Sequence, residues 1–296
     1  ANSEATVYVN GTEVTYHEGG YAAFRADITE LCKAEGENLL VIACNNGAND
    51  FVYPQNADFT FYGGLYRGVN LISVPNAHFD LEYYGGPGIM VTPKPADCGG
   101  AAFELEAFVK NADENFTVQY TILDEKGLEV AYVSRPASAP KVTVFLPDVH
   151  LWDFENPYLY IVTAELVRRN EVYDEIETRA GVRSFSVDPQ KGFFLNGVLT
   201  PLRGVARHQD RMYIGNALDA EEHYEDAYII KELGANTVRL AHYQHNQYFY
   251  DACDELGFAV WAEIPFISVM SKNPAAHENC RQQMKELIAQ NYNHPS

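Results

Sequence analysis

The feature that most constrains the fold is a change of pattern near Asp188. Before it, short runs of alternating apolar and polar residues are separated by turn residues, as expected of β-strands. After it, apolar runs alternate with amphipathic helical segments, the pattern of parallel βα units. The chain is therefore expected to be a multidomain β plus α/β protein.

Three strand–helix units are expected after Asp188. The predicted strands are 202–206, 237–240 and 258–264, and the predicted helices begin near Asp219, Tyr248 and Asn273. Asp219 and Glu222 have the spacing of a capping box, and Asn273-Pro274 is a typical helix start. The expected core stripe of the third helix is Cys280, Met284, Leu287 and Ile288. Because a closed (β/α)₈ barrel has eight such units in ~250 residues, these would be its first three.

The part before Asp188 is predicted to form two β domains. In the first, Asn10-Gly11 is a hairpin turn, and strands are expected over 39–43, 65–74 and 78–84. Residues 91–100, rich in Pro and Gly, are interpreted as a linker. In the second domain, 158–167 pairs with 172–178 across Arg169-Asn170. The expected domains are a jelly-roll sandwich over 1–92, an immunoglobulin-like sandwich over 93–187 and the start of a TIM barrel over 188–296.

Composition excludes several partners. With 21 Lys and Arg against 41 Asp and Glu, the net charge of −20 would repel a nucleic acid backbone. No apolar run is long enough to span a membrane, and no signal peptide is visible, so a cytoplasmic protein is expected by default. The five cysteines contain no C-x-x-C pair and are expected to be reduced thiols in the core.

Polar side chains follow the predicted parallel strands, at the end of the sheet where barrels place their active sites. Arg207 and His208 follow the first strand, Arg239 and His242 the second, and Glu263 the third. Two interpretations stay open: Arg239 and Glu263 brace adjacent strands as a buried ion pair, or the group binds a sugar or another polyol. A metal held by His242 and His245 is disfavoured, because no third ligand stands at helical spacing.

Several segments together resemble one enzyme family. They are NGVLTPLRGVARH (196–208), NTVRLAHYQHNQYFYDACDELG (236–257), VWAEIP (260–265), NYNHPS (291–296), DFTFYGGLYR (58–67) and LWDFENPYLY (151–160). The first four resemble the barrel of glycoside hydrolase family 2, which includes β-galactosidase and β-glucuronidase. The last two are similar to signatures of that family's jelly-roll and immunoglobulin-like domains, and the jelly-roll signature favours β-galactosidase.

The resemblance implies a retaining glycoside hydrolase that removes terminal β-linked galactose. Such enzymes use two carboxylates about 5–5.5 Å apart, one as nucleophile and one as acid/base. The family places the first in an Asn-Glu pair after the fourth barrel strand, so no catalytic residue is expected in this span and the chain alone is expected to be inactive. The Asn170-Glu171 pair is expected to be an ordinary hairpin turn.

The resemblance also implies four substrate-binding residues. Asp58 matches a jelly-roll aspartate that reaches the hydroxyls of the sugar, and a carboxylate accepts strong, charge-assisted hydrogen bonds from two of them. His208 and His242 match histidines near the sugar. Arg239 matches an arginine beside the catalytic glutamates, where its charge would keep the nucleophile ionised.

The chain departs from the family pattern at two places. Where metal-dependent β-galactosidases carry metal ligands, the chain has Ile267 and Val269, which cannot bind a hard cation, so no metal is expected there. The family usually has Asn where this chain has Ala206. No cofactor is expected, and the expected partners are a carbohydrate substrate and further copies of the chain.

Three alternatives stay open. The chain could be a β-glucuronidase or a β-mannosidase-type member of the same family. It could be a non-catalytic carbohydrate-binding module, since jelly-roll and immunoglobulin-like sandwiches often serve that purpose. It could also be an interaction fragment whose open barrel edge pairs with another chain.

Overall fold

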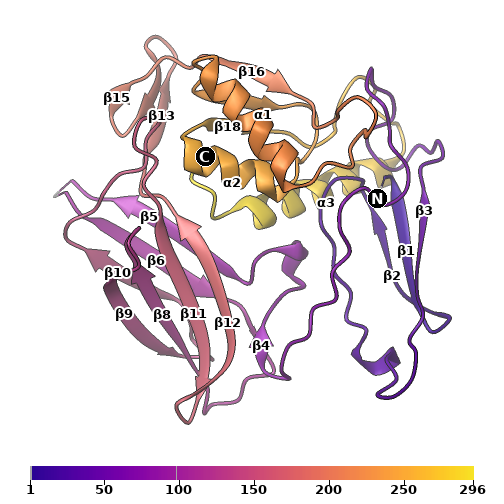
Figure 1. Ribbon diagram of the computed structural model, residues 1–296, viewed down its shortest axis with the longest axis horizontal. Coiled ribbons are helices and arrows are strands. Elements are labelled where there is room, and N and C mark those ends of the chain that lie inside the picture. Colours follow the sequence, from indigo (N-terminus) through magenta and orange to yellow (C-terminus); the bar gives the residue numbers. More distant parts are fainter. Residues whose placement is uncertain (1, 98) are drawn as a thin grey trace.

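The chain passes through two β units before it reaches a parallel sheet with helices (Figure 1). This computed structural model describes residues 2–97 and 99–296. The strands of the two β units are β1 (Glu4–Val9), β2 (Thr12–Glu18), β3 (Leu40–Asn45), β4 (His78–Phe79), β5 (Ile89–Pro95), β6 (Ala101–Ala107), β7 (Val109–Lys110), β8 (Thr117–Leu123), β9 (Glu129–Pro136), β10 (Val142–Leu146), β11 (Tyr160–Arg168) and β12 (Glu171–Ala180). Short 3₁₀ turns are η1 (Thr29–Leu31) and η2 (Tyr83–Gly85).

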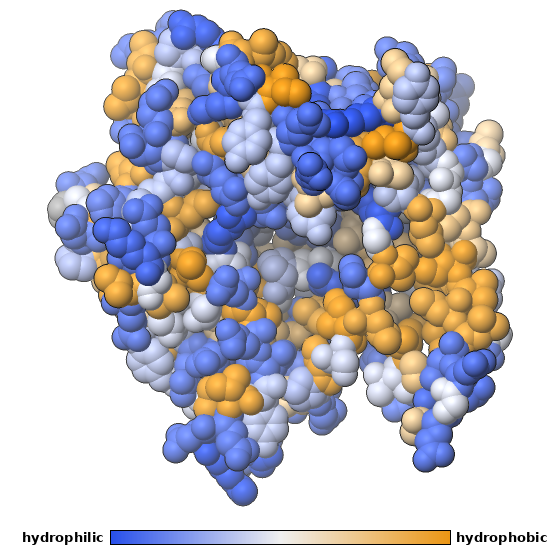
Figure 2. All heavy atoms as spheres, in the orientation of Figure 1, coloured by the Kyte–Doolittle hydropathy of each residue, from blue (hydrophilic) through white to orange (hydrophobic). Residues whose placement is uncertain are grey.

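The first unit contains one antiparallel sheet in the order β2-β1-β3. Its hairpin turn is the predicted Asn10-Gly11, whose positive φ angles of 52° and 85° suit Asn and Gly. The strand predicted over 65–74 does not form, and Leu71 in this segment is 83% exposed. Figure 2 shows apolar side chains gathered over β3, where Leu39, Leu40 and Val41 are exposed.

The second unit is a sandwich of two antiparallel sheets, β10-β6-β5 and β12-β11-β8-β9. Alternate residues of β6, β8 and β11 point inward, and Phe103, Val118 and Val162 are completely buried between the sheets. The predicted β11–β12 hairpin forms, with Arg168 opposite Glu171. The predicted linker is wrong in its first half: β5 continues to Pro95 and pairs with β6, so residue 92 lies inside a strand.

The third unit contains a small antiparallel sheet followed by the predicted three βα units. Its elements are β13 (Phe185–Asp188), β14 (Gly192–Leu195), β15 (Val198–Leu199), β16 (Gly204–Arg207), α1 (Ala220–Glu232), β17 (Thr237–Leu240), α2 (Gln247–Leu256), β18 (Ala259–Ala262) and α3 (Pro274–Asn291). Strands β16, β17 and β18 pair in parallel, while β13 to β15 form a small antiparallel sheet before them. Asp219 and Glu222 form the predicted capping box of α1, and Asn273 caps α3.

The parallel sheet and its helices expose apolar residues, as expected of a barrel that is open at its third strand. Trp261 on β18 is 67% exposed, and Leu233 after α1 is 71% exposed. The Ser296 carbonyl accepts a hydrogen bond of 2.8 Å from the Val260 amide of β18, so the last residue already lies along the edge of the sheet. Each of the three α-helices in the described ranges lacks the length or the hydropathy that a bilayer crossing requires.

The thiols are less buried than predicted. Cys253 of α2 is buried in the core, but Cys32 is exposed, and Cys44 and Cys280 are partly exposed. These four cysteines are free thiols, while Cys98 lies outside the described residues. The prediction of core thiols therefore holds for Cys253 alone among the described cysteines.

Helix α3 buries a different face from the one predicted. Met284 and Ile288 are 40% and 54% exposed, and of the predicted stripe only Leu287 is buried. The buried residues of α3 are instead Ala276, Asn279, Gln283, Glu286, Leu287 and Ala289. α3 buries this polar face because the face lies against the backbone of the first unit, whose amides and carbonyls need polar partners.

Asn279 and Gln283 make these contacts. The Asn279 side-chain oxygen accepts from the Tyr53 amide at 3.1 Å, and its nitrogen donates to the Glu18 carbonyl at 3.2 Å. Gln283 donates to the Tyr53 carbonyl at 3.2 Å and to Asn279 at 2.7 Å. Hydrogen bonds to buried backbone therefore dock α3 on the first unit.

Replacing Asn279 by Ala is expected to lower the free energy of unfolding by about 2–4 kcal/mol, because buried backbone groups lose their partners. Urea unfolding followed by circular dichroism measures the change. Met284→Ala, on the exposed face of the same helix, is the control and is expected to change stability by less than about 0.5 kcal/mol. Equal losses in both variants would contradict the docking role of Asn279.

Candidate functional site

The carboxyl ends of the three parallel strands bring the predicted polar residues together. Arg207 is the last residue of β16, Arg239 lies in β17, and His242 and Glu263 follow β17 and β18. Because the strands pair in parallel with little stagger, these ends meet at one edge of the sheet.

Arg239, His242 and Glu263 form one cluster on this edge. Arg239 Nε donates to Glu263 Oε1 at 2.5 Å, and Arg239 Nη2 lies 3.0 Å from His242 Nδ1. His242 Nδ1 also lies 3.3 Å from Glu263 Oε2. Burial alone would raise the pKa of Glu263, but hydrogen bonds from Arg239 and His242 outweigh it and keep the pKa below its usual value.

The expected Arg239–Glu263 pair therefore exists, but it is not buried. The Arg239 side chain is 47% exposed, whereas that of Glu263 is 18% exposed. An exposed pair of this kind contributes little to stability. Its guanidinium is accessible, so the pair braces two strands and also presents a cation at the surface.

His208, His242 and Phe59 pack against one another. The two imidazole centroids lie 5.1 Å apart, and Phe59 lies 5.3 Å from His208 and 5.8 Å from His242. Burial and the neighbouring His242 lower the pKa of His208, against the opposing charges of Asp210 and Asp58. His208 is therefore neutral at pH 7 and can accept or donate a hydrogen bond.

Asp58 is exposed and directly precedes Phe59, so it lies beside the histidines. The structure thus brings all four predicted substrate-binding residues, Asp58, His208, Arg239 and His242, to one place. Their role in binding sugar stays a prediction.

The loop that carries Asp58 is fixed to the barrel strands. Tyr62 donates to Asp210 at 3.2 Å, and Arg67 Nη2 donates to the Gln244 carbonyl at 2.9 Å. Arg67 Nη1 donates to the Tyr21 carbonyl in the first unit. Burial lowers the pKa of Arg67, which has backbone carbonyls as its acceptors. Residues 58–67 therefore belong to both the first unit and the site.

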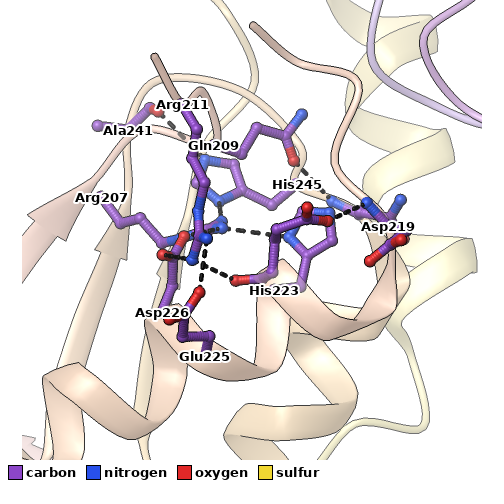
Figure 3. A network of polar contacts seen from close by, with 11 residues as sticks. Arg207, Gln209, Arg211, Asp219, His223, Glu225, Asp226, Ala241 and His245 are labelled. Atoms are coloured by element: carbon purple, nitrogen blue, oxygen red, sulfur yellow. Dashed lines mark hydrogen bonds and ion pairs between the residues drawn. The ribbon is translucent and has the colours of Figure 1, made fainter. Parts of the chain in front are cut away.

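A buried polar cluster lies next to the site (Figure 3). The sequence indicates Arg207 and His245 as separate polar residues but not their contact. Its centre is Arg207, which is 6% exposed. Arg207 Nε and Nη2 donate to Asp226 Oδ2 at 2.9 and 2.5 Å. Nη1 and Nη2 lie 3.1 Å from Nδ1 of His245 and of His223. We call these four residues the Arg207 cluster.

Both histidines of the Arg207 cluster are neutral. Arg207 can only donate, so each Nδ1 must accept and carry no proton. Burial, then the Arg207 charge, lowers the pKa of His223 to about 4 and that of His245 well below its usual value. The signal in the sequence was the pair Arg207-His208 at a strand end, but nothing there indicated which acceptors would meet the arginine.

The His242 and His245 pair does not fit a metal site. His245 Nδ1 accepts from Arg207, and its Nε2 lies 3.2 Å from the Ala241 carbonyl, so both ring nitrogens are engaged. Ile267 and Val269, at the positions expected to lack metal ligands, are apolar and partly or largely exposed.

Asp251, Asp254 and His294 are the residues within the described ranges that lie close enough to hold an ion. Each already has a protein partner: Asp251 pairs with Arg179 at 2.9 Å, and Asp254 pairs with His294 at 2.6 Å. Burial opposes protonation of His294, but the Asp254 charge and hydrogen bond outweigh it and raise its pKa. The group thus joins α2 to the last residues of the chain and to β12.

Comparison with known proteins shows the family. Models of glycosyl hydrolases family 2 match consecutive parts of the chain: the sugar binding domain over residues 1–75, the family's second model over 88–183 and the TIM barrel domain over 187–296. The chain therefore belongs to glycoside hydrolase family 2, as the sequence resemblance predicts, and its β units and three βα units are those of that family.

Its relatives include enzymes of two specificities. The crystal structure of an FMN-binding β-glucuronidase from Facaelibacterium prausnitzii L2-6 is 62% identical, with a TM-score of 0.98, and the match covers 99% of this chain and 45% of that one. A β-glucuronidase of Bacteroides fragilis is 35% identical over all of this chain and 45% of its own length. A β-galactosidase of Bacteroides ovatus is 31% identical, with 35% of its length covered. The chain thus spans less than half the length of these relatives.

Stability is expected to depend on pH through the neutral histidines of the Arg207 cluster. Below pH 6.5 the unfolded chain binds a proton at His223 that the folded chain binds only near pH 4, so stability falls as the pH falls through this window. His223→Gln keeps a neutral acceptor for Arg207 but removes this proton. Between pH 7 and pH 5 the parent should lose about 2 kcal/mol more than the variant.

Urea unfolding at the two pH values measures this difference. His294, whose pKa is raised, acts in the opposite direction, but it is present in both proteins and cancels in the comparison. Equal pH dependence in parent and variant would show that His223 is not held neutral.

Proposed function

We propose that this chain forms part of the sugar site of a retaining glycoside hydrolase that removes terminal β-linked glucuronic acid. The observation that carries the proposal is the 62% identity to a β-glucuronidase over 99% of the chain. Specificity is a property of the site rather than of the fold, and the 62% identity extends over 99% of the chain, including the three strand ends. The B. fragilis β-glucuronidase supports the same assignment.

The geometry suits recognition of a sugar. Asp58 offers an exposed carboxylate for two hydroxyls, while His208 and His242 offer ring nitrogens beside it. Phe59 supplies an apolar face between them. Arg239 presents a half-exposed guanidinium, which can keep a nearby catalytic carboxylate ionised.

The second candidate is a β-galactosidase, which the jelly-roll segment DFTFYGGLYR favours. The B. ovatus relative favours it, at half the identity of the F. prausnitzii enzyme. The two candidates differ at the sixth carbon of the sugar, which bears a carboxylate in glucuronate and a hydroxyl in galactose. Hydrolysis by two carboxylates needs no redox group, so the FMN in the name of one relative has no part in the proposed reaction. A homo-oligomer stays a prediction.

Calorimetric titration of the chain with methyl β-glucuronide and methyl β-galactoside tests the proposal. We expect saturable binding of the glucuronide and weaker binding of the galactoside. Asp58→Asn should weaken binding about tenfold or more, because charge-assisted hydrogen bonds contribute ~1.5–3 kcal/mol. Asp97→Asn, an exposed change of the same charge in the second unit, should leave the affinity unchanged.

A preference for the galactoside would favour the second candidate. Absence of binding for both sugars would contradict a sugar site within this span.

The 296-residue chain is expected to release no nitrophenol from nitrophenyl β-glucuronide or nitrophenyl β-galactoside. The physical reason is that the reaction needs two facing carboxylates, and the family pattern places neither within this span. A matched assay with the same chain extended through the remaining barrel strands provides the positive control. Turnover by the 296 residues themselves would show that carboxylates such as Glu263 had been assigned the wrong role.

A further inference from the structure

His245, which has no expected role in sugar binding, donates a hydrogen bond to the backbone of the turn after β17. This turn, residues 241–245, presents His242 and Tyr243 to the site. We propose that His245 is a positioning residue for the sugar site: it links Arg207 to the Ala241 carbonyl and so fixes where His242 lies. The role in sugar binding rests on the proposed function, whereas the positioning can be tested without a sugar.

The two hydrogen bonds of the His245 ring have a defined direction. Arg207 Nη1 donates to His245 Nδ1 at 3.1 Å, so the proton of the neutral ring must sit on Nε2. That nitrogen lies 3.2 Å from the Ala241 carbonyl and donates to it. His245 is completely buried, so water cannot replace either partner. The imidazole therefore joins the two groups with a fixed tautomer.

Arg207, to which His245 is bonded, is itself held by several contacts. Asp226 accepts two hydrogen bonds from Arg207, and the Phe249 ring centroid lies 4.0 Å from the guanidinium carbon. The Ala241 amide also donates to the Arg207 carbonyl at 3.0 Å. Ala241 is therefore tied to Arg207 twice, once through the backbone and once through His245. Figure 3 shows the link through His245.

His242 and Tyr243, the two residues that follow Ala241, are held by different contacts. His242 directly follows Ala241, and its Nδ1 lies 3.0 Å from Arg239 Nη2. Tyr243 stacks on Tyr21 with centroids 4.1 Å apart, so it keeps a close aromatic partner in the first unit besides its contact with the His245 ring at 5.3 Å. Loss of the bond to the Ala241 carbonyl should thus release His242 more than Tyr243.

Two variants of His245 separate its two bonds. His245→Gln has an oxygen that can accept from Arg207 and a nitrogen long enough to reach the Ala241 carbonyl. The side chain of His245→Asn can accept from Arg207, but it is one methylene shorter, so its nitrogen does not reach the Ala241 carbonyl. His223→Gln is the matched control, because it changes another buried, neutral acceptor of Arg207 that lies on α1 and that, among the described residues, makes no side-chain hydrogen bond to the turn.

Nuclear Overhauser contacts between ring protons of His242 and those of His208 and Phe59 report the position of His242 without any sugar. In the parent, these rings lie 5.1 and 5.8 Å apart between centroids, so contacts are expected. They should persist in His245→Gln and His223→Gln and disappear in His245→Asn. Methyl β-glucuronide should bind about tenfold more weakly to His245→Asn, as expected for one lost buried hydrogen bond.

The outcomes are distinguishable. Contacts that persist in His245→Asn would overturn the positioning role, even if that variant is less stable. Equal loss in His223→Gln would show that the Arg207 cluster acts through general stability and would also overturn it. A parent that shows the ring contacts but binds no sugar would contradict the proposed function and leave the positioning intact. If His245→Asn does not fold, failure of His245→Gln to retain the contacts decides against the proposal.

Discussion

A guanidinium buried at the end of a β-strand must have its charge and its donors satisfied within the protein. Arg207 donates to one carboxylate, Asp226, and to two neutral histidines, and its guanidinium lies over the Phe249 ring. These acceptors come from α1 and from the turn after β17. One side chain therefore links the first strand, the first helix and the turn after the second strand of the barrel. The site residues His208 and Arg239 lie on the same strand ends, and they also contact Phe59 and Glu263, respectively.

A second polar contact surface ties the first unit to the barrel. Helix α3 uses Asn279 and Gln283 to satisfy backbone groups of residues 18 and 53, where a helix of a closed core would use apolar side chains. Arg67 does the same from the other side, through the carbonyls of Tyr21 and Gln244. Because these bonds need defined geometry, they fix the orientation of the two units more strictly than apolar packing would.

Local patterns were sufficient for much of the fold. The Asn10-Gly11 turn, the Asp219 capping box and the Asn273-Pro274 helix start depend on neighbouring residues, and all three form as predicted. The predictions failed where a distant neighbour decides. Met284 and Ile288 were assigned to the core by helical spacing, but the first unit takes the polar face of α3 instead.

The site shows the same division. The strand-end position and the family motif located Asp58, His208, Arg239 and His242, which the structure brings together. The role of Arg207 and His245 depends on which acceptors meet a buried cation, and these lie 16 and 38 residues apart from Arg207 in sequence. No periodicity or spacing encodes such a contact.

The two sides of the site come from different units: Asp58 and Phe59 from the first, and His208 and His242 from the barrel. A molecule that contacts both sides binds only when the units are docked, so its binding free energy adds to that of docking. Affinity and the cohesion of the units are therefore thermodynamically linked. A substitution at the contact between α3 and the first unit would therefore change the affinity for such a molecule by changing the fraction of proteins in which the two units are docked.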